Sequence, residues 1–449
     1  MGILISAARM KKYIYLKITA LLSIVTPIII YIWTKTTVGE LIRKQHEPSV
    51  FCPWMISEQT ITPLKNTKHL LVSAYMDQRL GGFDLRIIGI FKRDLVDALY
   101  CSFCCAGFLS ETTPSIILPH PDHFGFPYGT MDVLCQIPDN CDATYVTLLT
   151  APSTVTTSEQ LWIPIRNKKT SKKEENELDF TVCISTLFGN YNNVLQFAQT
   201  LEIYRLLGVN RVVIYNSSCG PELGRLLNGY SQEGFVEMVP WPIDQYLNPS
   251  RGWNFKEHGG DLQYFGQIVT LNECIYRSME RSRYVLLNDI DEIIMPYLHD
   301  NLNSMMDMLQ SHYPNVAEFL IESHVFPNKY FEPSRKFHLH RWSNVPGINI
   351  LEHIYREDPD SNYHPYKMIV QPRLVEQTSV HEVLTKFGQR FKVPMEVCRI
   401  IHIRVALRGS LKLEQLHVDK RLWDFQEKLI PNVDKALRRA GQLREEEQS

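Results

Sequence analysis

The chain has 449 residues, of which 44% are hydrophobic and 21% are charged, and its formal net charge is −2. Such a composition is typical of a globular protein, and the length leaves room for more than one domain. The balanced charge and the lack of a long basic face argue against nucleic-acid binding.

An apolar stretch over residues 13–33 predicts a transmembrane anchor. It has about the 20 residues that a bilayer requires, and its one charge, Lys17, can reach the interface. Three basic residues shortly before the stretch predict that residues 1–12 are cytosolic and that the rest is lumenal, as in a type II membrane protein. A cleaved signal peptide is the alternative, but the stretch is long for one.

Three segments of different character follow the anchor. Residues 34–67 are polar with scattered prolines, which predicts a stem that holds a domain off the membrane. Residues 68–165 contain short apolar or alternating runs separated by turns, which predicts a small β-rich domain. The charged residues 166–178 are interpreted as a solvated linker.

The ten cysteines favour an oxidising compartment, because five of them fall between residues 101 and 141 without the paired spacing of a zinc site. We therefore expect disulfides, whose pairing the sequence leaves open. Cys183 and Cys274 lie within an apolar strand pattern and an apolar helix pattern, where a buried thiol is the simplest interpretation.

An α/β pattern covers residues 179–410. The apolar run 180–186, the periodic run 194–207 and the apolar run 211–215 predict a right-handed βαβ unit with parallel strands. The next predicted elements are a helix over 222–230, a strand over 236–239 and a helix over 262–279. This alternation predicts a nucleotide-binding α/β domain, followed by a helical tail over 411–449.

An apolar strand over residues 283–287 leads directly into the acidic sequence Asp289-Ile290-Asp291-Glu292. Ligands of open α/β sheets collect at the carboxyl ends of strands, and the period of a strand places Asp289 and Asp291 on one face. Two carboxylates completed by a diphosphate suit Mg²⁺ or Mn²⁺. The sequence has no glycine-rich phosphate-binding loop, so a metal is expected to bear the charge of the diphosphate. A helix cap with its turn is the structural alternative.

A second Asp-x-Asp sequence, Asp358-Pro359-Asp360, lies in a different context. Its surroundings are polar and interrupted by proline, which predicts a solvated turn and no metal site.

Several segments of the α/β region resemble glycosyltransferases of the GT-A type, and more closely glycosyltransferase family 92. The resemblance covers roughly residues 180–410. It rests on Val182–Thr186 with Val213–Tyr215, on Asn288–Glu292, and on the carboxyl segments Tyr366–Pro372, Val380–Val383 and Ile401–Arg404. It implies a GT-A, Rossmann-like catalytic domain that follows the anchor and the β-rich domain in the sequence.

The resemblance implies an inverting, metal-dependent hexosyltransferase of the Golgi membrane with a lumenal catalytic domain. Such an enzyme transfers galactose from UDP-galactose to galactose or fucose of a glycoprotein glycan in β1,4 linkage. The implied partners are a UDP-sugar, a glycan acceptor and the membrane, and a homodimer is compatible with the sequence. Two alternatives stay open, namely another UDP-sugar as donor and a non-catalytic glycan-binding or scaffold protein.

The predicted site residues fall into three groups. Mn²⁺ is assigned to Asp289 and Asp291, and by analogy with GT-A enzymes to His402 near the carboxyl end. Inversion requires a general base, for which four residues compete. The candidates for the base are Glu292, Glu322, His381 and Glu382, and those for donor binding are Thr186, Tyr215, Asn216, Asn272, Asp289 and Lys367.

Overall fold

The computed structural model of the protein describes residues 26, 27, 31, 52, 55–152, 160–168, 178–359, 366–406 and 411–443. Two compact units are distinguished, Met1–Cys52 and Pro53–Ser449, and both large sheets belong to the second. The predicted anchor lies outside the described residues except for Thr26, Pro27 and Tyr31. Within the described part of the chain, no helix is long and apolar enough to cross a membrane.

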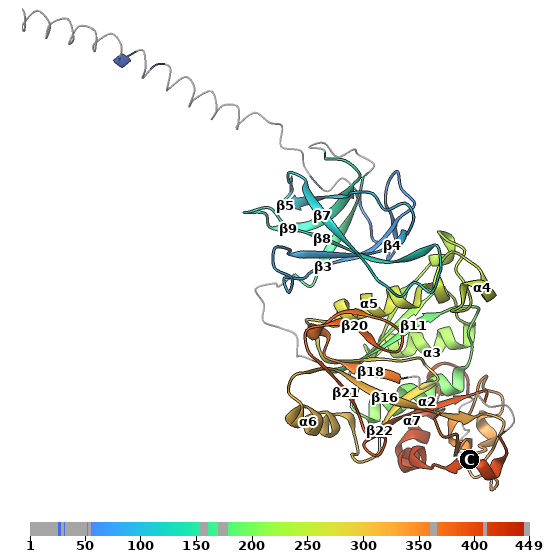
Figure 1. Ribbon diagram of the computed structural model, residues 1–449. Coiled ribbons are helices and arrows are strands. Elements are labelled where there is room, and N and C mark those ends of the chain that lie inside the picture. The colour runs from blue at the N-terminus through green and yellow to red at the C-terminus, as the bar shows by residue number, and fades with distance from the viewer. Residues whose placement is uncertain are drawn as a thin grey trace, which may run out of the picture. The chain divides into compact units, whose positions relative to one another are not determined.

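The first sheet has ten strands and lies amino-terminal to the α/β region (Figure 1). Its strands follow the order β1-β10-β9-β5-β7-β8-β4-β3-β2, with β6 beside β5, and a further pairing between β10 and β3 closes the ring. Alternate side chains such as Phe91, Phe103 and Val146 fill its interior. The strands are β1 (Met55–Ile56), β2 (Thr62–Pro63), β3 (Leu70–Met76), β4 (Leu85–Lys92), β5 (Tyr100–Cys105), β6 (Phe108–Leu109), β7 (Thr113–Pro119), β8 (Tyr128–Cys135), β9 (Ala143–Leu149) and β10 (Leu161–Arg166).

Disulfides tie this first sheet together, as the cysteine usage predicted. Cys101 is bonded to Cys135 and Cys105 to Cys141. A third disulfide joins Cys183 to Cys274, so the interpretation of these two residues as buried thiols was wrong. The two residues face each other between a strand and a helix, a proximity that the local pattern of neither segment reveals.

The second sheet has nine strands in the order β13-β12-β11-β14-β18-β16-β22-β15, with β21 beside β16. The four strands β13, β12, β11 and β14 are parallel, which confirms the predicted βαβ unit, whereas the remainder of the sheet is mixed. The strands are β11 (Leu178–Leu187), β12 (Arg211–Asn216), β13 (Val236–Pro240), β14 (Ser282–Leu287), β15 (Glu292–Pro296), β16 (Val316–Pro327), β18 (Tyr366–Val370), β21 (Gln389–Lys392) and β22 (Cys398–Arg404).

Helices cover both faces of the second sheet. On one face, α2 and α3 pack with the carboxyl-terminal α7 around residues such as Phe197, Leu226 and Leu437. On the other face, α5 lies against the strands and also contacts β3 and β4 of the first sheet, as Figure 1 shows. These helices are α2 (Val194–Leu206), α3 (Pro221–Gln232), α5 (Gln267–Ser278) and α7 (Gln426–Arg439), and α6 (Leu302–His312) follows β15.

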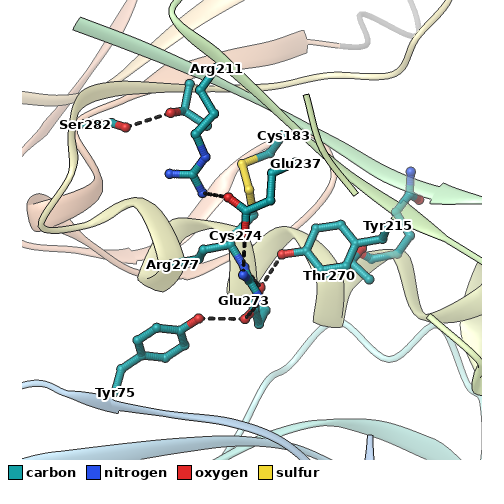
Figure 2. The surroundings of a disulfide bond; sticks show 12 residues. Tyr75, Cys183, Arg211, Tyr215, Glu237, Thr270, Glu273, Cys274, Arg277 and Ser282 are labelled. Carbon is teal, nitrogen blue, oxygen red and sulfur yellow. Dashed lines mark hydrogen bonds and ion pairs between the residues drawn. A yellow bond between two sulfur atoms is a disulfide. The ribbon is translucent and has the colours of Figure 1, made fainter. Parts of the chain in front are cut away.

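Buried charges join α5 to the first sheet (Figure 2). Glu273 of α5 accepts hydrogen bonds from the hydroxyl of Tyr75 at 2.6 Å, from the hydroxyl of Tyr215 and from Arg277 at 2.9 Å. Burial alone would raise the pKa of Glu273, but Arg277 and the two phenols lower it to about 2. The carboxylate is therefore fully paired and ionised within the fold.

A second buried centre in the same region surrounds Arg86 of β4. Its guanidinium is fully buried and donates to Asp77 at 2.9 Å, to Asp132 at 2.5 Å and to Glu376 at 2.7 Å. Glu376 belongs to the α/β region, so this arginine links the two parts of the second unit. We call the residues around Arg86 and Glu273 the junction network.

The helix predicted over 262–279 begins later than expected. α5 starts at Gln267, and the preceding residues Tyr264, Phe265 and Gly266 all have positive φ angles of 40°, 54° and 80°. The apolar periodicity continues through this segment, so the sequence pattern alone did not mark the change of conformation.

Candidate active site

A turn between β14 and β15 carries the acidic motif. Asn288 is buried, and its side-chain amide donates to the backbone oxygens of Asp289 at 3.0 Å and Glu292 at 2.9 Å and to the hydroxyl of Tyr204 at 2.6 Å. These bonds fix the turn so that the side chains of Asp289 and Asp291 are 38% and 34% exposed. The carboxylates thus lie at the carboxyl end of a parallel strand, accessible to a ligand.

Lys367 of β18 neutralises part of this charge. Its buried ammonium lies 3.0 Å from Oδ2 of Asp289 and 3.5 Å from Oε2 of Glu292. Burial by itself would raise the pKa of Asp289, but Lys367 and nearby imidazoles hold it below its ordinary value. Burial raises the pKa of Glu292, which also accepts a hydrogen bond from the backbone N–H of Asp289.

His402 lies beside these residues on β22, the strand that pairs with β15. It pairs with Glu292 in the register of β15 and β22, and its Nε2 lies 3.3 Å from Oδ2 of Asp291. Its Nδ1 lies 3.3 Å from Oε1 of Glu292. Burial lowers the pKa of His402, but Glu292 and Asp291 together hold it above its ordinary value. We call these five residues the site cluster: Asp289, Asp291, Glu292, Lys367 and His402.

Aromatic residues border the site cluster. The pKa of Tyr264 is raised by burial and by the charges of Asp289 and Asp291, and the pKa of Tyr191 is raised by the same causes. Stacking of Phe188 on Phe265, with ring centroids 4.2 Å apart, holds the left-handed turn that carries Tyr264. Residues other than glycine rarely adopt positive φ, and such conformations cluster at functional sites.

Comparison with protein families identifies the α/β region. The sequence model of glycosyltransferase family 92 matches residues 178–440, which is more than half of the chain. The chain belongs to glycosyltransferase family 92. The matched segment contains the acidic turn, Lys367 and His402, so the site cluster lies wholly within the family domain.

Curated relatives come from Caenorhabditis elegans. The glycosyltransferase family 92 protein F13G3.3 is 28% identical over 51% of this chain and 43% of its own length. The beta-1,4-galactosyltransferase galt-1 is 21% identical over 54% of this chain and 55% of its own length. The matched part thus spans about half the length of these relatives.

Two predicted donor residues of this family 92 domain are directed elsewhere. The hydroxyl of Tyr215 bonds to Glu273 of the junction network (Figure 2). The side-chain amide of Asn272 donates to the backbone oxygens of Ile268 and Thr378, both at 2.8 Å. The structure therefore does not bring these two side chains to the site cluster.

The other donor candidates lie along the same edge of the sheet. Thr186, near the end of β11, donates to the backbone oxygen of Phe265 at 3.3 Å and so supports the left-handed turn. Asn216 ends β12, and within the described part of the chain its buried Oδ1 has no hydrogen-bond partner.

The four candidates for the general base differ in their surroundings. Glu322 is paired with Lys392 at 2.9 Å and Glu382 with Arg390 at 2.9 Å, whereas Glu292 is buried within the site cluster. The Nδ1 of His381 lies 2.9 Å from the backbone oxygen of Tyr366. Burial, followed by the charge of Lys367, lowers the pKa of His381.

Sequence reasoning missed four contributors to this region. The motif includes Asn288 but gives it no role, and no sequence pattern marks Tyr191 or Tyr264. Helical periodicity places Gln267 in a helix but does not reveal that its amide lies 3.4 Å from Oδ1 of Asp289. Gly266 was the one local sign of the left-handed turn. Among the described residues, no group of three or more His, Cys, Asp or Glu side chains is arranged to hold a metal ion.

Proposed function

We propose that this chain is an inverting β1,4-galactosyltransferase that uses UDP-galactose, and that its catalytic domain is of the GT-A type. The supporting observation is the pair of accessible carboxylates, Asp289 and Asp291, at the end of β14, with Lys367 and His402 beside them. The name of the relative galt-1 supports the choice of galactose and of the β1,4 linkage.

The parallel strands β12, β11 and β14 provide the surface for the donor. Their carboxyl ends share one edge of the sheet, where GT-A domains bind a nucleotide. Asn216 ends β12 at this edge of the sheet and would border a bound uracil ring. Uracil beside β12 and diphosphate beside β14 would span the intervening strand β11.

Mn²⁺ is the proposed cofactor. Asp291 and His402 would hold it, because a carboxylate oxygen and an imidazole nitrogen face each other across 3.3 Å at the accessible side of the cluster. These two donors leave coordination positions for a diphosphate. When bound, the metal supplies charge stabilisation to the departing UDP. Asp289 is paired with Lys367, which would add a second positive charge near the same phosphates.

We assign the general base to His381. A carbonyl oxygen can only accept, so the contact of Nδ1 with Tyr366 requires the proton on Nδ1 and leaves the lone pair on Nε2. The lowered pKa keeps this imidazole neutral near pH 7. Nε2 would take the proton of the acceptor hydroxyl as its oxygen bonds to the anomeric carbon and the bond to UDP breaks.

The proposed location is the Golgi membrane, with residues 13–33 as a type II anchor and the catalytic domain in the lumen. The basic residues before this stretch and the disulfides of the first sheet support it. Protection of the carboxyl terminus from protease in intact vesicles is expected, and digestion from the cytosolic side would contradict the topology.

The decisive experiment is a panel of UDP-sugars, each with Mn²⁺, in donor-hydrolysis and transfer assays. UDP-galactose is expected to be the preferred donor, and proton NMR of the product is expected to show a β-anomeric coupling. An α-anomeric coupling, or turnover only with another UDP-sugar, would overturn the assignment while leaving the family membership intact.

A further inference from the structure

A pocket with a volume of about 280 Å³ lies between the segment that follows β16 and the start of α2. It belongs to neither the site cluster nor the donor edge of the sheet. Its volume is close to the lower end of the range for small-molecule sites, roughly 300–1,000 Å³. One or two sugar rings are ligands of suitable size.

The walls of the pocket continue from the strands that carry the site cluster. Asn328 follows β16, and its backbone N–H donates to the oxygen of Arg404 at 2.9 Å, two residues beyond His402. On the other side, Leu195 lies in the first turn of α2, four residues after Tyr191, and the charge of Asp291 helps to raise the pKa of the Tyr191 phenol. The pocket therefore lies on the side of the sheet where β16 and β22 end.

One wall of the pocket is fixed by close packing of the loop 346–348 against the start of α2. Gly347 has φ of +118°, and a Cβ atom there would collide with Oδ1 of Asn193. This oxygen instead accepts a hydrogen bond from the backbone N–H of Ile348 at 2.8 Å, and Leu195 donates to the oxygen of Pro346 at 2.9 Å. The loop is thus fixed on the start of α2.

The lining combines an aromatic face with hydrogen-bonding groups. Phe331 is 45% exposed, the centroid of its ring lies 5.0 Å from that of His353, and the guanidinium of Arg335 lies 5.5 Å from the same centroid. Glu352 accepts from Nδ1 of His338 at 3.1 Å. A pyranose has an apolar C–H face and a rim of hydroxyls, so an aromatic ring beside a carboxylate and imidazoles matches it on both counts.

We propose that this pocket binds a sugar unit of the acceptor glycan. The inference rests on the proposed function, because a transferase needs its acceptor next to the reactive end of the donor. The face of Phe331 stacks on the sugar ring, and Glu352 with His338 bonds to its hydroxyls. The residues of the pocket thereby determine which glycan is extended.

The test compares the full-length protein with F331A and with the control F108A, an aromatic residue of β6 with a similar exposure of 47%. With lactose as acceptor, F331A is expected to raise the KM for lactose about tenfold while the KM for UDP-galactose stays within about twofold. F108A is expected to change neither KM, and F331Y, which keeps an aromatic ring, is expected to have the lactose KM of the wild type. An unchanged lactose KM in F331A, or an equal rise in both constants, would overturn the proposal.

Saturation-transfer NMR without donor separates this proposal from the proposed function. Lactose and a core-fucosylated chitobiose glycan serve as probes, and at least one is expected to bind the wild type and to lose about tenfold in affinity in F331A. Donor hydrolysis without binding of either probe would overturn the pocket alone. Probe binding that depends on Phe331, without any turnover of UDP-galactose, would overturn the proposed function and leave the pocket.

Discussion

The junction network and the site cluster both consist of carboxylates beside cations, but they differ in how completely those charges are buried. In the junction network, the buried Arg86 bonds to three carboxylates, and Glu273 receives donors on both oxygens. In the site cluster, about a third of each of the side chains of Asp289 and Asp291 is exposed. Charges that are buried and bonded within the protein fix a structure, whereas accessible carboxylates are available to a ligand.

This difference predicts opposite effects of substitution. Removing a member of the junction network leaves a partner charged and buried, so the loss is expected in stability. Removing an exposed member of the site cluster relieves repulsion between neighbouring carboxylates, so the loss is expected in activity. The following experiments test that separation, beginning with the largest expected effect.

Arg86→Leu is expected to lower the free energy of unfolding by about 3–5 kcal/mol, because three buried carboxylates lose their common partner. Denaturant unfolding of the variant and the wild type measures it. Arg283→Ala, which removes an exposed pair with Asp307, is the matched control and is expected to change stability by less than about 1 kcal/mol. Equal effects of the two substitutions would contradict the role of the junction network.

Asp291→Ala is expected to lower kcat by about a hundred- to thousandfold, a loss of about 3–4 kcal/mol in transition-state stabilisation. Its melting temperature is expected to match that of the wild type. Asp358→Ala is the control, because that aspartate lies in the second Asp-x-Asp sequence and pairs with the exposed His417 at 2.9 Å. If both variants kept full activity, the site cluster would not be catalytic.

Much of the fold could be predicted from periodicity. The strand–helix–strand unit over 180–215 was found, because its apolar residues follow the periods of strands and helices within single segments. Asp289 and Asp291 were recognised for the same reason, since an apolar strand runs straight into them. The left-handed turn at Tyr264 was missed, because side-chain periodicity does not encode the sign of φ.

The direction of single side chains could not be predicted in the same way. Tyr215 and Asn272 lie on predicted elements, but tertiary partners in distant segments determine where their polar groups bond. The pairing of Cys183 with Cys274 depends on how α5 docks on β11. His402 was chosen by analogy with GT-A enzymes, and its place opposite Glu292 depends on a strand pairing that the sequence alone did not reveal.

Acidification is expected to weaken the junction network through Glu273. Its pKa is about 2 in the folded protein against an ordinary value of 4.5, so the folded state favours the ionised form. The stabilisation, about 3 kcal/mol at most, is present above pH 4.5 and is lost as the pH falls toward 2. Melting temperatures of the wild type and Glu273→Gln across this range measure it. The variant is expected to show the flatter dependence, and parallel curves would contradict the assignment.

The smallest expected effect concerns Tyr264, which holds a φ of 40° at the edge of the site cluster. Glycine adopts this conformation without strain, so in Tyr264→Gly the relief of strain offsets the lost ring contacts, and stability is expected to change by less than about 1 kcal/mol. The KM for UDP-galactose is expected to rise about tenfold, because the phenol near Asp289 and Asp291 is gone.

Phe124, in the loop between β7 and β8, is the matched control. It is also an aromatic residue with a positive φ, of 50°, and its ring packs edge-on against Trp253. Phe124→Gly is expected to leave the KM unchanged. If the two glycine variants had the same KM, the left-handed turn at Tyr264 would serve the fold alone and would belong with the junction network.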